Sequence, residues 1–144
     1  MFKNITVGID GSDHCWRALD LACDLAKHYE GKIHLVHAPE IPPSAMVIGI
    51  GAIDMPVDME QIMATGQAVM VQAAKRARAN GSEPASQIVR IGTPASEVIH
   101  TAEATSSDLI VTGRRGVGGM ASLFLGSTSQ KIAHEAQCAV LTVK

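Results

Sequence analysis

Glycines and hydroxyl side chains gather in one stretch of the chain, GRRGVGGMASLFLGST, which runs from Gly113 to Thr128. The stretch directly follows the apolar run DLIVT and precedes a segment with helical spacing. In α/β proteins, a loop between a strand and a helix binds phosphate on backbone N–H groups and on the helix N-terminus. The residue types and their position therefore point to a ligand that carries phosphate.

Two common phosphate-binding motifs fit this stretch poorly. The Walker A motif requires G-x-x-x-x-G-K-[ST], and the Gly-Ser step of the stretch lacks the lysine. The dinucleotide fingerprint G-x-G-x-x-[GA] can be traced through Gly116, Gly118 and Ala121. It also requires an acidic residue at the end of the next strand, to bind the ribose, and the run CAVLTV ends without one. We therefore exclude a Walker A loop and discount NAD and FAD as ligands.

A third pattern does fit: G-x-x-G, then nine residues, then G-S, formed by Gly113, Gly116, Gly126 and Ser127. With this spacing the chain closely resembles the nucleotide-binding branch of the universal stress protein family. The resemblance extends over essentially the whole chain and includes the runs ITVGIDGS, HLVHA, GTP and CAVLTV. It implies an α/β, Rossmann-like fold whose open five-stranded parallel sheet has the order 3-2-1-4-5, with helices on both faces. It also implies a homodimer and an adenine nucleotide as ligand, ATP or else AMP or ADP, together with Mg²⁺.

The glycines and hydroxyl groups of this motif suit a chain of phosphates. The candidate residues are Gly113, Gly116, Gly126, Ser127, Thr128 and Ser129. The first two glycines would let the backbone approach a ligand closely or adopt a positive φ. The Gly-Ser-Thr step would bring free N–H groups and hydroxyls to the phosphates at the start of a helix, and Ser129 lies in the same first turn. An isolated glycine after a strand is usually a turn residue, but the fixed set of positions favours nucleotide binding.

Four further residues complete the candidate site: Asp10, Ala38, Arg114 and Arg115. The two arginines could neutralise phosphate charge, although a solvated position is about as plausible for them. The resemblance implies that Asp10 and Ala38 lie against the adenosine, Ala38 through its backbone. A carboxylate at Asp10 suits ribose hydroxyls or a water-bound Mg²⁺ better than direct contact with a phosphate. The alternative role of Asp10 is that of a turn former or a helix cap.

Strand-like and helix-like segments alternate along the chain and must position these residues. Apolar side chains at every second position of residues 3–10 predict a strand, followed by a helix that begins after Ser12 and is closed by Gly31. Further strands are predicted over 32–38, 86–91, 108–112 and 138–143, with helices over about 57–80, 93–105 and 127–135. This alternation predicts a parallel sheet covered by helices on both faces.

The candidate residues come together only where the order of the strands reverses. In the implied order the first and fourth strands are neighbours, and the chain winds away from this point in both directions. Ligands of open α/β sheets bind in the crevice outside the carboxyl ends of the strands at such a point. We therefore expect Asp10 and Gly113 to face each other across that crevice.

One long loop departs from the compact pattern. Residues 39–56, PEIPPSAMVIGIGAIDMP, are punctuated by proline and glycine but are too apolar for an ordinary solvated linker. We predict a lid or a packing flap, with disorder as the alternative. A second flexible point is expected at Gly118 and Gly119, which would let the glycine-rich stretch become ordered when a ligand binds.

Bulk properties exclude several classes of protein. The chain has 144 residues, which suits one domain over 1–144, and a net charge of -2 without a block of Lys or Arg, which argues against a nucleic-acid-binding protein. Three cysteines without a C-x-x-C spacing argue against a disulfide framework and a zinc site. No apolar run suits a signal peptide or a membrane span, so we expect a cytoplasmic location without membrane insertion.

Motifs that would support catalysis are missing from the sequence. It contains no G-x-S-x-G elbow and no pair of acids placed for general acid and base chemistry, so we expect a regulatory switch or sensor. The resemblance to the family implies that this switch acts in stress response, on an unidentified protein partner. Two alternatives stay open: a slow ATPase or autophosphorylating protein, and a nucleotide-independent scaffold or chaperone-like dimer. The apolar strand over 138–143 is predicted at a sheet edge, where it would form the homodimer by edge pairing.

Overall fold

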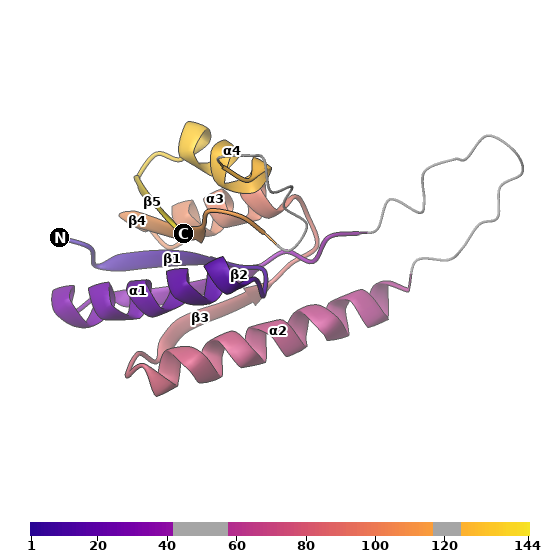
Figure 1. Cartoon of the computed structure of the whole chain (residues 1–144), viewed down its shortest axis with the longest axis horizontal. Coiled ribbons are helices and arrows are strands. Elements are labelled where there is room, and N and C mark those ends of the chain that lie inside the picture. Colours follow the sequence, from indigo (N-terminus) through magenta and orange to yellow (C-terminus); the bar gives the residue numbers. More distant parts are fainter. Residues whose placement is uncertain (42–57, 117–124) are drawn as a thin grey trace, which may run out of the picture.

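The computed structural model describes residues 1–41, 58–116 and 125–144 (Figure 1). Strands and helices alternate in the order β1 (Asn4–Ile9), α1 (Asp13–Tyr29), β2 (Lys32–His37), α2 (Met59–Ala79), β3 (Pro84–Val89), α3 (Pro94–Ala104), β4 (Leu109–Gly113), α4 (Ser127–Glu135) and β5 (Ala139–Val143). The strands form one sheet of order β3-β2-β1-β4-β5, in which every neighbouring pair is parallel. The predicted fold class and strand order are therefore confirmed.

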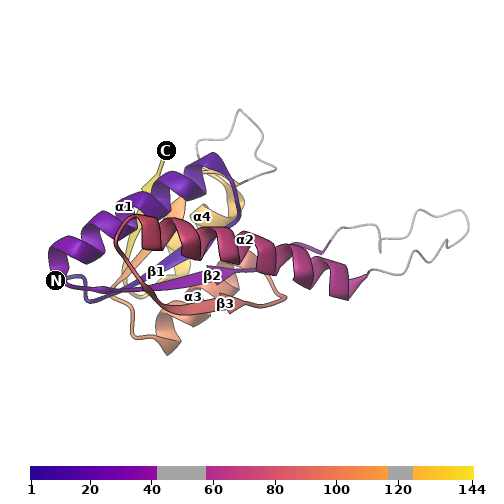
Figure 2. The same cartoon turned by 90° about the horizontal axis from the view of Figure 1, so that it is seen from below.

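Helices cover both faces of the sheet. Helices α1 and α2 lie on one face and α3 and α4 on the other, as Figures 1 and 2 show from two directions. Ile5, Val7 and Ile9 of β1 belong to the core under α1 and α2, as their alternate spacing predicts. Gly8 faces the opposite layer, where a Cβ atom would lie 3.2 Å from Val98 Cγ2 of α3. The central strand is thus packed on both sides, which fixes where its carboxyl end lies.

Helix α1 begins as predicted but ends differently in detail. Ser12 is its N-cap, and the Ser12 Oγ accepts a hydrogen bond from the backbone N–H of Cys15 at 3.2 Å. At the other end, Glu30 rather than Gly31 has the left-handed backbone, with φ of 52°. Gly31 is needed for close packing instead, because a Cβ atom there would collide with the carbonyl oxygen of Phe2.

Strand β3 begins two residues before the predicted start, at Pro84, which pairs with Ile33 of β2. Proline has no N–H to donate, and the first position of an edge strand tolerates this loss. From the sequence, Pro84 therefore argues against a strand at this position, and only the pairing with β2 shows that β3 begins there.

Several predictions fall on segments outside the described residues. Most of the predicted lid, residues 42–56, belongs to them, as do Gly118 and Gly119. Of the helices within 1–41, 58–116 and 125–144, none combines the length and the hydropathy that a membrane span requires.

Candidate functional site

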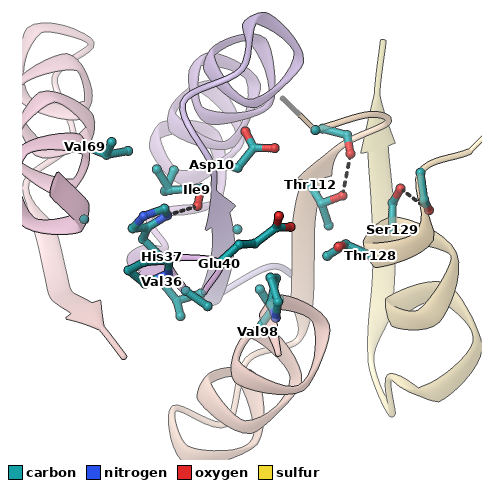
Figure 3. Close-up of a pocket in the computed structure, with 18 of the residues that line it drawn as sticks. Ile9, Asp10, Val36, His37, Glu40, Val69, Val98, Thr112, Thr128 and Ser129 are labelled. Carbon is teal, nitrogen blue, oxygen red and sulfur yellow. Dashed lines mark hydrogen bonds between the residues drawn. The ribbon is translucent and has the colours of Figure 1, made fainter. Parts of the chain in front are cut away.

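A cavity of about 780 Å³ lies at the carboxyl ends of β1, β2 and β4 (Figure 3). Strand β1 pairs with β2 on one side and β4 on the other, so the cavity is at the point where the strand order reverses. Nine of the ten predicted site residues line it: Asp10, Ala38, Gly113, Arg115, Gly116, Gly126, Ser127, Thr128 and Ser129. The structure therefore brings the predicted residues together from three separate parts of the chain.

The carboxylate of Asp10 is held in a defined orientation at the end of β1. Its Oδ1 accepts hydrogen bonds from the backbone N–H of Ser12 at 2.9 Å and from the Ser12 hydroxyl at 2.7 Å. The other oxygen, Oδ2, faces Gly116, where a Cβ atom would lie 2.9 Å away. Asp10 therefore takes the turn role that its sequence position allows and still lines the cavity.

Ser12 joins the turn after β1 to the loop after β4. Besides its bonds with Asp10 and Cys15, its hydroxyl is 3.2 Å from the carbonyl oxygen of Arg115. The sequence predicts Ser12 as the helix cap, and this contact across 103 residues adds a second role. One side chain thus fixes the helix start, the Asp10 carboxylate and the backbone of the glycine-rich stretch.

The motif glycines are required because neighbouring atoms lie where a Cβ atom would be, and none of them has a positive φ. Within the described residues, the glycines with positive φ are Gly11 and Gly81. A Cβ atom on Gly113 would lie 2.9 Å from the backbone nitrogen of Cys15, in the first turn of α1. Gly113 therefore lets β4 pack against α1, whereas Gly116 makes room for the carboxylate of Asp10.

The N-terminus of α4 differs from the other helix starts in the described part of the chain. Its N-cap is Gly126, which supplies no side chain to cap the helix, and the first backbone bond runs from Gln130 N–H to Gly126 at 2.9 Å. The first turns of the other three helices carry an acidic residue, Asp13, Glu60 and Glu97, and that of α4 carries none. The partial positive charge of this end thus has no built-in anion and is available to one from outside.

Three consecutive hydroxyl residues begin α4, and they differ in what they contact. Ser127 and Thr128 line the cavity. The buried Ser129 donates to the carbonyl oxygens of Arg114 at 3.0 Å and Gly126 at 3.1 Å, and the N–H of Gly126 also bonds to Arg114 at 2.8 Å. Ser129 thus ties the two ends of the glycine-rich loop together, and contact of its hydroxyl with a ligand stays a prediction.

The two adjacent arginines also differ. Arg115 lines the cavity, whereas Arg114 does not. The backbone N–H of Arg114 bonds to the carbonyl oxygen of Val143 in β5 at 2.7 Å, and its Nε is buried without a hydrogen-bond partner among the described residues. Of the pair, only Arg115 belongs to the cavity wall, and contact of Arg115 with a ligand stays a prediction.

Reasoning from the sequence missed several residues of the cavity wall. Glu40 lies shortly after the end of β2, and Val69 belongs to α2, far from the motif in sequence. His37, at the end of β2, donates from Nδ1 to the carbonyl oxygen of Ile9 at 2.6 Å, which fixes its ring beside β1. Glu40 could have been predicted, because it lies two residues after the candidate residue Ala38. Val69 could not, because its place in the cavity wall depends on how α2 packs against the sheet.

Cys15 lies next to the site without the properties of a reactive thiol. Its Sγ is buried and accepts a weak hydrogen bond from the N–H of Asp10 at 3.4 Å. Burial raises the pKa of the Cys15 thiol to about 11, so the thiol stays protonated at neutral pH. Cys15 is therefore a small apolar core residue in this structure.

Comparison with known proteins agrees with the fold and with the family that the chain resembles. The pattern of the universal stress protein family matches residues 1–144. The chain belongs to this family. A universal stress protein of Thermus aquaticus is 34% identical over 144 residues, with both chains covered completely, and the universal stress protein YxiE of Bacillus subtilis (strain 168) is 30% identical over 149 residues, again with complete coverage.

A solved universal stress protein shares the architecture as well. It was crystallised in complex with cAMP, is 27% identical, and superposes with a TM-score of 0.73 over 99% of this chain and 97% of that chain. The family's sheet and helix arrangement therefore extends to this member.

Proposed function

We propose that this universal stress protein binds an adenine nucleotide, ATP with Mg²⁺, and acts as a regulatory switch in stress response. The observation that carries the proposal is the uncapped, acid-free N-terminus of α4 in the same cavity as the oriented carboxylate of Asp10. The first suits phosphate, and the second suits the hydroxyl donors of a ribose. A nucleotide presents both groups at once.

The wall of the cavity gives each part of a nucleotide a suitable surface. The backbone amides at Ser127 and Thr128 would receive the phosphates, and Asp10 Oδ2 would accept from the ribose. The apolar part, which includes Ala38 and Val69, would hold the base. The cAMP bound by the solved relative supports an adenine nucleotide as the ligand class.

A magnesium ion fits this site as a companion of the phosphates. The lining residues include two carboxylates, Asp10 and Glu40, and no group of three His, Cys, Asp or Glu side chains that could hold a metal occurs among the described residues. Mg²⁺ keeps several waters and is commonly bound through one or two carboxylates plus phosphate oxygens. The proposal therefore has the cation arrive with the nucleotide.

Pairing of two copies through β5 is a further part of the proposal. Strand β5 pairs with β4, and in the described part of the chain its other edge carries no strand. Its residues are exposed or half-buried, which suits a homodimer joined edge to edge. Sedimentation at micromolar concentration tests this part: we expect a dimer, and a monomer would contradict it.

The proposal includes a cytoplasmic location. All three cysteines are free thiols, which fits a reducing compartment. Fractionation of cells tests it, and recovery of the protein outside the cytoplasm would overturn this part.

Two measurements test nucleotide binding directly. Mass spectrometry of the ligand released from freshly purified protein is expected to detect an adenine nucleotide, and titration calorimetry with Mg·ATP is expected to give saturable binding. Absence of binding in both would overturn the proposal. Incubation with γ-labelled ATP then separates a switch from an enzyme, since the switch leaves the protein unlabelled and the ATP intact over many hours.

A further inference from the structure

Two carboxylates, from the ends of neighbouring strands, line the cavity. Asp10 extends from the end of β1, and Glu40 follows β2 (Figure 3). In the close-up, the carboxylate of Glu40 points into the cavity toward Thr112 and Thr128, the side on which α4 begins. The acid therefore faces the end of the cavity that suits an anion.

These two acids are not equivalent. One oxygen of Asp10 accepts two hydrogen bonds from Ser12, which partly satisfy its charge. Glu40 is exposed and has no hydrogen bond or ion pair with any residue of the described ranges. Its negative charge therefore acts on whatever enters the cavity, because none of the described residues forms a bond or an ion pair with it, although the cation Arg115 also lines the cavity.

We propose that Glu40 selects ligands by their charge, so that the cavity disfavours a bare polyphosphate and accepts a nucleotide with few charges or one neutralised by a divalent cation. This inference rests on the proposed nucleotide binding and names a determinant of specificity within it. The N-terminus of α4 fixes where a phosphate lies, and Glu40 adds a penalty that grows with the number of negative charges nearby.

The size of the penalty follows from Coulomb's law. One negative charge at about 10 Å from the carboxylate, in an environment close to water, changes affinity by about twofold. Removing the Glu40 charge should therefore leave adenosine binding unchanged, tighten cAMP binding by about twofold and AMP binding by about fourfold, and tighten metal-free ATP binding, with its four charges, by about sixteenfold. With saturating Mg²⁺ the gain for ATP should fall to a few-fold or less, because the cation already offsets the ligand charge and because Glu40 is one of the two lining carboxylates available to that cation.

The test is a calorimetric titration of wild-type protein and the Glu40→Gln variant with adenosine, cAMP, AMP and ATP, in EDTA and again in Mg²⁺. Glu40→Asp keeps the charge and is expected to retain the wild-type order of affinities. Glu103→Gln is the matched control, because Glu103 is an exposed acid on α3 that does not line the cavity. This control changes the net charge equally and should leave every affinity as in the wild type.

The outcomes separate this inference from the proposed function. Gains in Glu40→Gln that rise with ligand charge and shrink in Mg²⁺ support it. Equal changes for all four ligands, including adenosine, would overturn it, as would unchanged affinities while the wild type binds normally. Failure of both proteins to bind any of the four ligands would instead overturn the nucleotide-binding proposal itself, and Glu40 with it.

Discussion

Asp10 and Gly116 lie so close across the cavity that a Cβ atom on Gly116 would come within 2.9 Å of Asp10 Oδ2. The two residues are separated by 106 positions in the sequence and belong to different loops. Because Oδ1 is already bonded to Ser12, the carboxylate cannot rotate away without losing those bonds. Asp10 can therefore keep this orientation only if residue 116 has no side chain.

We expect Gly116→Ala to weaken nucleotide binding with little effect on stability. The added methyl group displaces a carboxylate in an open cavity, and no rigid backbone stands against it. Calorimetry should show a loss of affinity of at least about tenfold, the size expected when a charge-assisted hydrogen bond is lost. Thermal unfolding should stay within a few degrees of the wild type, and an unchanged affinity would contradict the proposed role of Asp10.

Gly113→Ala, unlike Gly116→Ala, should mainly lower the stability of the fold. Here the added Cβ meets backbone atoms, the nitrogen of Cys15 and the carbonyl carbon of His14, both at 2.9 Å. Backbone of a helix start cannot yield as a side chain does, so we expect a loss of about 1–3 kcal/mol in the free energy of unfolding. Denaturant unfolding measures this loss, and a variant as stable as the wild type would refute the packing role of Gly113.

Ser12→Ala should lower both stability and affinity. Loss of the helix cap costs about 1 kcal/mol, and loss of the bonds to Asp10 and Arg115 frees the carboxylate and the loop after β4. Ser12→Thr keeps the hydroxyl and should restore most of both properties. Paired unfolding and binding measurements check this, and full affinity in Ser12→Ala would show that the bridge does not orient Asp10 for ligand.

Stability should fall in mild acid through His34 of β2. The ring is buried and bonds from Nδ1 to Ser86 Oγ at 2.9 Å, and burial, together with the nearby Lys32 charge, lowers the pKa of His34. Below about pH 6.5 the unfolded chain takes up a proton that the folded protein resists, so the free energy of unfolding decreases as pH falls, by at most about 1.4 kcal/mol per pH unit.

Urea unfolding between pH 7.5 and pH 5 tests this dependence. His34→Gln keeps a polar group and should flatten the profile, whereas His100→Gln removes an exposed histidine and should not. Equal pH profiles for wild type and His34→Gln would contradict the assignment.

Most of the fold was predictable because its signals are local. The alternate apolar positions of β1, the Ser12 cap and the apolar run of β4 each depend on a few neighbouring residues, and all three appear as predicted. The left-handed Glu30 and the start of β3 at Pro84 were not predictable in the same way. The start of β3 is decided by pairing with β2, and Gly31 is required by the Phe2 carbonyl, so both depend on segments far away in the sequence.

By itself, the sequence determined the alternation of strands and helices, the resemblance to the family, and the spacing of Gly113, Gly116, Gly126 and Ser127. The tertiary structure alone decided how these positions divide their roles. Gly113 packs on α1, Gly116 makes room for Asp10, Ser129 ties the loop, and Glu40 enters the cavity from β2. The physical reason is that the role of a glycine or a charged side chain depends on the atoms that it contacts. Here the contacting residue is often about a hundred positions away in the sequence.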